Sequence, residues 1–138
     1  MTIRQIPDFL SPGRTKVMGI INVTPDSFSA GGAWFNPEKA IAHALELAAA
    51  GADILDIGGE STRPGAHPLS PTQEQERVLP VISGYLKASR SPLPISLDTV
   101  NAETAAAGLA AGVQIINDIS GGTLDAGMLK VVAENNAY

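Results

Sequence analysis

VMGIINVTPDSFSAGG, which runs from Val17 to Gly32, changes from apolar to polar at a single position. The run from Val17 to Ile21 is nearly all apolar, which is the pattern of a strand buried on both faces in a parallel sheet. Asn22 is the first polar side chain, and the proline and glycines after it do not extend a strand or a helix. A polar residue at the end of a buried strand, before a long loop, is typical of the ligand-binding edge of parallel α/β folds. The alternative is that Asn22 only caps a local turn.

The same pattern of strand, loop and helix occurs four times. Strands are predicted at residues 17–23, 54–57, 94–98 and 113–116, and helices follow them at residues 37–48, 71–86, 101–111 and 128–134. The polar residues that end the strands are Asn22, Asp56, Asp98 and Asn117. This alternation predicts an α/β fold of the (β/α)₈ TIM-barrel type, with those side chains gathered at the C-terminal edge of the strands. A full barrel has eight units and about 250 residues. The chain of 138 residues therefore supplies about the first four units of one barrel domain, residues 1–138, with no second domain.

Prolines give two local predictions. Pro80 falls inside the helix predicted at residues 71–86, and it is expected to kink or split that helix because proline lacks the backbone N–H. Residues 1–14 contain two prolines and a glycine, and they are expected to form a short edge segment or hairpin.

The composition excludes several classes of protein. A net charge of -5 without any long basic run argues against a nucleic-acid partner. The absence of cysteine excludes disulfides, thiolate chemistry and cysteine-based zinc sites. No apolar run approaches the ~18 residues that cross a bilayer, and residues 1–12 do not resemble a signal peptide. We expect a soluble, cytoplasmic protein without a membrane partner.

Three residues could bind an anionic or heterocyclic ligand, and each has a simpler explanation. Asp98 could accept hydrogen bonds from the N–H edge of a heterocycle, or it could cap the helix that begins near Asn101. Asn117 offers a donor and an acceptor to a fused nitrogen heterocycle, or it could be satisfied by the backbone. Arg63 lies among small polar residues that suit a phosphate-like anion, or it could be an ordinary surface arginine.

A metal site has weaker support in the sequence. Asn22 could complete a Mg²⁺ shell together with phosphate oxygens, because Mg²⁺ takes oxygen ligands and often receives several of them from the substrate. His43 and His67 lack ligand spacing and are expected to be structural or solvated. The paired glycines at residues 58–59 and 121–122 match neither a dinucleotide-binding motif nor a P-loop.

Four motifs occur in order along the chain: MGIINVTPDSFS, DIGGESTRPGA, PISLDT and INDISGG. From about Lys16 onward, the sequence resembles the dihydropteroate synthase family. The resemblance implies a (β/α)₈ barrel and a transferase of folate biosynthesis. Members of the family join 6-hydroxymethyl-7,8-dihydropterin diphosphate to para-aminobenzoate, release diphosphate, and bind sulfonamides at the aminobenzoate site. The resemblance also implies a Mg²⁺ cofactor and a homodimer for the full-length protein.

The resemblance assigns roles at matching positions. Asn22 would help to hold Mg²⁺ and diphosphate, and Asp98 and Asn117 would bind the pterin ring. Mg²⁺ would stabilise charge on the departing diphosphate, so that the pterin methylene develops cationic character before the amine adds.

Four further positions lie in the two loops. Thr62 and Arg63 belong to a loop that would close over the diphosphate. Arg63, together with Asn22 and the metal, would stabilise the charge on the departing diphosphate. Phe28 and Pro64 would shape the aminobenzoate pocket.

Two departures from the family pattern are visible. Ala30 stands where the family usually has Asp, and Tyr138 falls where a fifth strand would start. The later units of the family carry another pterin-binding Asp, a Lys and an Arg-x-His pair, so the chain alone is expected to be inactive and to associate through its open sheet edges. Two alternatives stay open. One is a non-catalytic pterin-binding half-barrel that needs a partner. The other is the pterin-binding domain of a corrinoid-dependent methyltransferase, which lacks the TPDSFS and ESTRPG loops.

Overall fold

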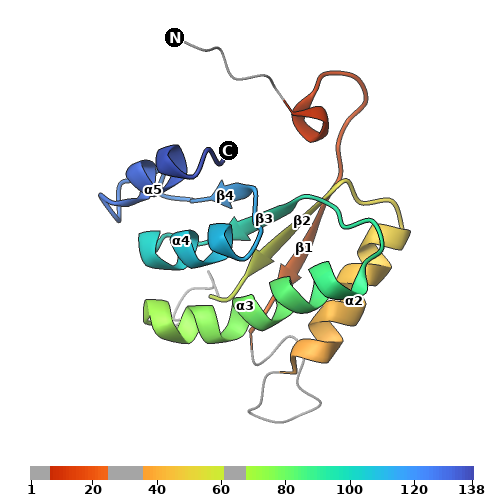
Figure 1. Ribbon diagram of the computed structural model, residues 1–138, viewed down its shortest axis with the longest axis horizontal. Helices are drawn as coiled ribbons and strands as arrows, with labels where there is room; N and C mark the ends of the chain where they lie inside the picture. The colour runs from red at the N-terminus through yellow and green to blue at the C-terminus, as the bar shows by residue number, and fades with distance from the viewer. Residues whose placement is uncertain (1–6, 25–35, 61–67) are drawn as a thin grey trace.

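The computed structural model describes residues 7–24, 36–60 and 68–138. Four parallel strands form one sheet in the order β1-β2-β3-β4 (Figure 1). The strands are β1 (Met18–Asn22), β2 (Ile54–Gly58), β3 (Ile95–Asp98) and β4 (Ile115–Asn117), and the helices are η1 (Asp8–Leu10), α2 (Pro37–Ala49), α3 (Pro71–Ala88), α4 (Ala102–Ala110) and α5 (Met128–Glu134). The predicted alternation of four strands and four helices is confirmed.

Local sequence signals explain where the helices begin. The side chain of Asn36 accepts hydrogen bonds from the backbone of Glu38 and Lys39, and a proline occupies the first position of α2. At α3, the Ser70 hydroxyl accepts from the Gln73 N–H at 3.2 Å, while the Gln73 side chain accepts from the Ser70 N–H at 3.1 Å. Both predicted caps are therefore confirmed, including the capping box of α3.

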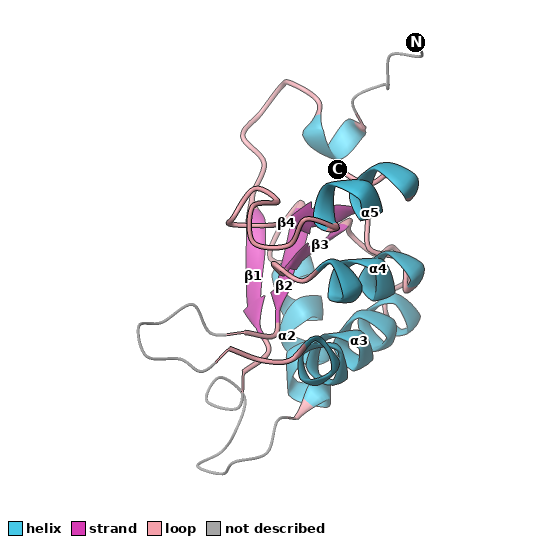
Figure 2. Ribbon diagram, turned by 90° about the vertical axis from the view of Figure 1, so that its left-hand side faces the viewer, coloured by secondary structure: helices cyan, strands magenta, loops and turns pink. Residues whose placement is uncertain are grey.

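The hydrophobic core lies between the sheet and helices α2, α3 and α4, which cover one face of the sheet (Figure 2). Its largest fully buried members include Ile21, Leu55, Ile57, Ile95 and Leu97 from the sheet and Val78, Val81, Ile82 and Tyr85 from α3. Helices α2 and α3 approach closely at Gly84, where an added Cβ would lie only 2.2 Å from Ile41 Cδ1 and would force that side chain to move. The helices and strands thus form two layers around this main core, and a second, smaller cluster of Ala102, Ala105 and Met128 lies between α4 and α5.

Strand β1 corrects a prediction. Gly19 and Ile21 of this strand face α2 and the core, but Met18 is 43% exposed, Ile20 is 61% exposed and Asn22 is also exposed. The expected burial of this strand on both faces is therefore wrong in the described structure. The reason is geometric: successive side chains point to opposite faces, and the described helices cover only one of them.

Helix α3 and the N-terminal segment give two further corrections. Helix α3 runs without interruption through Pro80, which is exposed, so of the predicted kink or split the split is wrong and the kink stays a prediction. The proline ring lies on the solvent side, where water can satisfy the carbonyl that lost its partner. Residues 7–14 contain the 3₁₀ helix η1 and no strand, so the predicted hairpin is absent from the described part of this segment.

Two contacts hold the ends of the described chain against the sheet. The Arg14 guanidinium makes two hydrogen bonds to the carboxylate of Asp53, which also accepts one from the Val17 N–H at 2.8 Å. These hydrogen bonds lower the pKa of Asp53 to about 2. At the other end, the Tyr138 carbonyl accepts from the Ile116 N–H at 2.8 Å, and the Tyr138 N–H donates to the Gln114 carbonyl at 3.1 Å. Tyr138 therefore pairs beside β4, where a fifth strand was predicted to start.

Candidate functional site

One row of residues crosses the C-terminal ends of the four strands. In the sheet register Asn22 pairs with Gly58, Gly58 with Asp98, and Asp98 with Asn117. Residues paired in a parallel register point to the same face, and here it is the face opposite the helices. The predicted gathering of Asn22, Asp98 and Asn117 at one edge is therefore confirmed. Asp56 lies on the same face, two residues earlier on β2.

Gly58 leaves the space that Asp98 occupies. A Cβ added to Gly58 would lie 3.3 Å from both the Cβ and the Oδ2 of Asp98, closer than most Cβ contacts. The carboxylate of Asp98 therefore lies over the backbone of β2. The sequence pattern assigns this glycine no role, because its place beside Asp98 depends on the register of β2 and β3.

The structure tests the helix-cap explanation of Asp98. The first N–H of α4, from Ala102, donates to Asp125 Oδ2 at 2.8 Å, and the Asn101 N–H donates to Thr99 Oγ1 at 3.1 Å. The helix-cap explanation is therefore wrong, because Asp125 and Thr99 serve as the caps. The Asp98 carboxylate forms no hydrogen bond with the described residues, so its acceptor sites are available to a ligand.

Burial and neighbouring charge both act on this carboxylate. Asp98 is partly buried, and this burial, together with the negative charges of Asp56, Glu74, Glu60 and Asp118, raises its pKa to about 6. Acceptor-only oxygens that are held in a negative environment favour a ligand edge that carries N–H donors.

Asn117 is held by a side chain and not by the backbone. Its Nδ2 donates to Asp56 Oδ2 at 3.1 Å, so the backbone-satisfied alternative is wrong. Asp56 is buried, and its Oδ1 has no partner among the described residues. The neighbouring Ser96, paired with Asp56 in the register, also has a buried hydroxyl without a described partner. The bond to Asp56 leaves the side-chain oxygen Oδ1 of Asn117 and one amide N–H without a partner among the described residues, so both are available to a ligand.

Asn22 is exposed at the end of β1, and its side chain forms no hydrogen bond with the described residues. Nothing described therefore supports the local-turn alternative. In the ranges that the structure covers, no group of three or more His, Cys, Asp and Glu residues could hold a metal. The chain offers one amide oxygen at this position, which suits Mg²⁺ only if water and substrate oxygens supply the other ligands. His43, as predicted, is a solvated surface residue, with Nδ1 3.6 Å from Glu46 Oε2.

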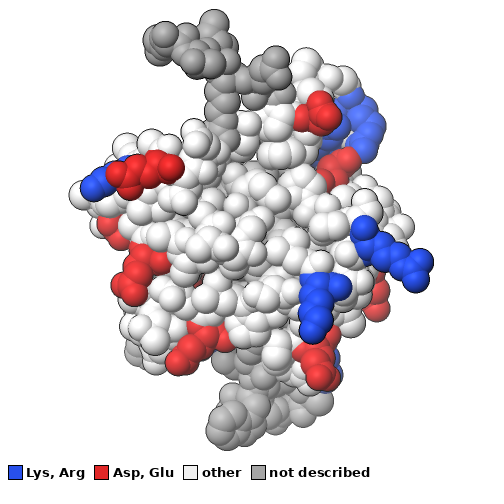
Figure 3. All heavy atoms as spheres, viewed as in Figure 1, with Lys and Arg blue, Asp and Glu red and all other residues white. Residues whose placement is uncertain are grey.

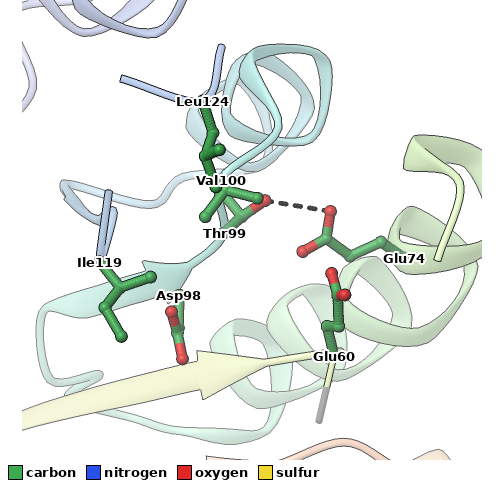
Figure 4. Close-up of a pocket in the computed structure, with 7 residues that line it drawn as sticks. All are labelled: Glu60, Glu74, Asp98, Thr99, Val100, Ile119 and Leu124. Carbon is green, nitrogen blue, oxygen red and sulfur yellow. Dashed lines mark hydrogen bonds between the residues drawn. The ribbon is translucent and has the colours of Figure 1, made fainter. Parts of the chain in front are cut away.

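A cavity of about 200 Å³ opens beside Asp98 (Figure 4). It is lined by Glu60, Glu74, Asp98, Thr99, Val100, Ile119 and Leu124. Carboxyl groups form one part of the wall and apolar side chains form another, as Figure 4 shows. This combination fits a flat ring with apolar faces and N–H donors along one edge. Burial and the charge of Glu74 raise the pKa of Glu60.

Glu74 is a buried residue that the sequence analysis missed. Its Oε2 accepts hydrogen bonds from Thr99 Oγ1 at 3.0 Å and from Asn101 Nδ2 at 2.9 Å. Its position in the first turn of α3 resembles that of any polar helix residue, and neighbouring Glu76 is exposed. No local sequence signal separates the two.

Several predicted positions lie outside the described residues. They are Phe28, Ala30, Thr62, Arg63, Pro64 and His67. Their assignments stay predictions.

On the face of the molecule in Figure 3, Lys and Arg side chains lie apart from one another and around an uncharged centre. In the described part of the chain, no helix combines the length and apolarity needed to cross a bilayer.

Comparison with known proteins decides the family. The sequence profile described as "Pterin binding enzyme" matches residues 18–138. The chain belongs to the pterin-binding enzyme family. Two curated relatives in this family are dihydropteroate synthases. The enzyme of Streptococcus pyogenes serotype M1 is 47% identical over 133 residues, which cover 96% of this chain and 49% of the relative. The enzyme of Bacillus subtilis is 51% identical over 123 residues, which cover 89% of this chain and 42% of the relative.

Solved structures of pterin-binding enzymes agree with the fold. Dihydropteroate synthase from Clostridium difficile, crystallised in the presence of pteroic acid, matches with a TM-score of 0.83 and 45% identity, over 90% of this chain and 46% of that structure. The Xanthomonas albilineans enzyme with 4-aminobenzoic acid matches with a TM-score of 0.81 and 48% identity, over 90% and 44%. The chain thus spans about half the length of its relatives. The predicted fold class is confirmed as a partial TIM barrel.

Proposed function

We propose that the chain is the N-terminal half of a single pterin-binding barrel domain in a dihydropteroate synthase. This transferase condenses 6-hydroxymethyl-7,8-dihydropterin diphosphate with para-aminobenzoate, giving 7,8-dihydropteroate and diphosphate in folate biosynthesis. The observation that carries the proposal is the row in which Asp98 and Asn117 stand side by side next to an acid-lined cavity. Relatives with bound 4-aminobenzoic acid and 6-hydroxymethylpterin-monophosphate support the two substrates.

The pterin ring binds at this row. Asp98 accepts from adjacent N–H donors of the ring, and Asn117 pairs with a neighbouring donor and acceptor. Asp56 fixes the amide of Asn117 through the bond at 3.1 Å, so the orientation of that amide is set before the ligand arrives. Val100, Ile119 and Leu124 provide apolar contact for the ring.

Diphosphate binds at the end of β1 and in the two loops. Asn22 would contribute one oxygen ligand to Mg²⁺, which would supply positive charge for the leaving diphosphate. Thr62 and Arg63 bind the same anion, and Arg63 stabilises the charge that develops on it. Phe28 and Pro64 shape the aminobenzoate pocket, where sulfonamides compete. The support for these loop assignments is the resemblance at the TPDSFS and ESTRPG motifs.

The full-length protein is proposed to be a cytoplasmic homodimer that acts on small molecules without a nucleic-acid or membrane partner. One second candidate keeps a specific observation in its favour. The exposed Met18 and Ile20 on the uncovered sheet face fit a pterin-binding half-barrel that is completed by another chain. The pterin-binding domain of a corrinoid-dependent methyltransferase ranks behind both, because the TPDSFS and ESTRPG loops are present.

The decisive experiment uses a full-length protein that contains this chain. Formation of dihydropteroate from the two substrates should require Mg²⁺, disappear with a chelator and return when Mg²⁺ is added in excess. A protein that binds a pterin but forms no product would support the non-catalytic candidate. A protein that binds no pterin would overturn the proposal.

A further inference from the structure

We infer that Glu74 is a positioning residue of the pterin pocket, which holds the turn after Asp98 in place through Thr99 and Asn101. The inference rests on the proposed function, because it gives the pocket beside Asp98 a pterin ligand. It adds a residue from helix α3 to a site that the strand ends otherwise form. Glu74 acts on the ligand through Asp98 and is not itself proposed as a catalytic residue.

A single oxygen of Glu74 organises this turn. Glu74 Oε2 accepts from Thr99 Oγ1 at 3.0 Å and from Asn101 Nδ2 at 2.9 Å. Thr99 Oγ1 in turn accepts from the Asn101 N–H at 3.1 Å. Thr99 follows Asp98 directly, and its backbone N–H donates to the Asn117 carbonyl at 3.1 Å. The network therefore connects Glu74 to the turn after Asp98, and the same turn is bonded to the backbone of Asn117.

Helix α3 anchors the same network to the end of β2. Arg77 Nη1 donates to the Gly59 carbonyl at 3.0 Å. A Cβ added to Gly59 would lie 2.9 Å from Val78 Cγ1 and 3.3 Å from Glu74 Cγ, so the strand end packs directly on the helix. Because α3 is fixed to β2 in this way, Glu74 holds the turn after β3 at a defined distance from β2.

Glu74 also lies against the cavity beside Asp98. Glu74 is only 1% exposed, and its Oε1 has no hydrogen-bond partner among the described residues. Glu74 also makes no ion pair within the described ranges, although a buried carboxylate is costly without a compensating partner. The residue lines the same cavity as Asp98 and Glu60, and Figure 4 shows the three carboxyl groups around it. Glu74 therefore borders the proposed ligand site while its hydrogen bonds go to the turn after Asp98.

The test uses the full-length protein and 6-hydroxymethylpterin as the calorimetric probe. Glu74→Ala removes the acceptor, Glu74→Gln keeps an acceptor of the same shape, and Glu76→Gln is the matched control on the exposed face of α3. We expect the pterin Kd to rise about tenfold or more for Glu74→Ala, since two buried donors lose their partner. It should stay within about threefold for Glu74→Gln and remain unchanged for Glu76→Gln. The aminobenzoate Kd should be unaffected in all three.

A double-mutant cycle separates positioning from a purely structural role. When Asp98→Asn has already weakened pterin binding, Glu74→Ala should add little further loss, because its effect passes through Asp98. Equal losses in both backgrounds, or equal impairment by Gln and Ala, would overturn the inference. If Glu74→Ala fails to fold, Thr99→Val and Thr99→Ser replace it: Val should impair pterin binding and Ser should restore it. A parent protein that binds no pterin would instead refute the proposed function.

Discussion

The side-chain amide of Asn117 donates a hydrogen bond of 3.1 Å to the carboxylate of Asp56. These residues belong to β4 and β2, and β3 lies between them in the sheet. The bond therefore crosses a whole strand diagonally, because Asp56 is level with Ser96 on β3 whereas Asn117 is level with Asp98. It joins the two halves of the four-stranded sheet on the face where the proposed ligand binds.

Asp56→Ala in the full-length protein should weaken pterin binding by ~1 to 2 kcal/mol, because Asn117 loses the bond that orients its amide. Calorimetry with 6-hydroxymethylpterin measures the change. Asp53→Ala is the matched control on the neighbouring turn, since Asp53 pairs with Arg14 away from the row. Equal pterin affinities for the two variants would show that Asp56 does not orient the ring-binding amide.

Asp98→Asn should impair pterin binding far more than aminobenzoate binding. Only an acceptor-only carboxylate matches two adjacent ring donors, whereas an amide presents one N–H₂ group to the same edge. Calorimetry with each ligand separately provides the comparison. A pterin affinity within about twofold of the parent would contradict a ring-binding role for this carboxylate.

The pH dependence of pterin binding should follow the ionisation of Asp98, whose pKa is raised from 3.8 to about 6 by burial and neighbouring carboxylates. The folded protein holds this proton more tightly than the unfolded chain does. Ionised Asp98 therefore lowers the free energy of unfolding above about pH 6, and this penalty is relieved as the pH falls from about 6 toward 3.8. Pterin binding has the opposite trend, because it needs the carboxylate: affinity should fall by up to about tenfold per pH unit below that pKa.

Calorimetric titrations across this pH range check the prediction, with Asp98→Asn as the control. The variant should lose the acidic limb of the profile. If parent and variant show the same pH dependence, the titrating group is not Asp98.

Arg63→Ala in the full-length protein should slow the transfer with the fold intact. The expected cost in the barrier is roughly 2 to 4 kcal/mol, because the guanidinium no longer stabilises charge on the departing diphosphate. The turnover rate in steady-state kinetics and the affinity for diphosphate should both fall. Unchanged turnover together with normal diphosphate binding would remove Arg63 from the proposed anion site.

The 138 residues by themselves should form no dihydropteroate and should self-associate. Met18 and Ile20 lie two positions apart on the edge strand β1, and both are exposed on its uncovered face. An exposed apolar edge strand favours association with other chains. Analytical ultracentrifugation should show species larger than a monomer, and Ile20→Lys should shift the distribution toward monomer. A monodisperse monomer that makes product would contradict the half-barrel interpretation.

The parts of the fold that depend on nearby residues could be predicted from the sequence. The capping box of Ser70 and the bounds of α5 follow from signals within a few residues, and both match the structure. The exposure of Ile20 could not be predicted, because an apolar strand does not reveal which of its faces will be covered. The cap of α4 was also out of reach, since Asp125 lies far along the chain from the helix it caps.

The same distinction applies to the site. Asn22, Asp98 and Asn117 could be placed together because each ends a predicted strand, and parallel strands end at one edge. The bond between Asn117 and Asp56 depends on side-chain geometry across three strands. The position of Glu74 depends on how α3 is rotated against the sheet, which neither periodicity nor charge pattern specifies.

The two backbone bonds of Tyr138 place it opposite Ile115 in a parallel ladder. Its side chain therefore belongs to the face that carries Asp56 and Ser96. If a polypeptide continued from Tyr138 in this alignment, its second residue would stand level with Asn117 and face the same ligand. A shift of one residue would break both bonds and turn that side chain toward the helices. The backbone pairing of Tyr138 thus determines which position of such a segment would face the proposed pterin site.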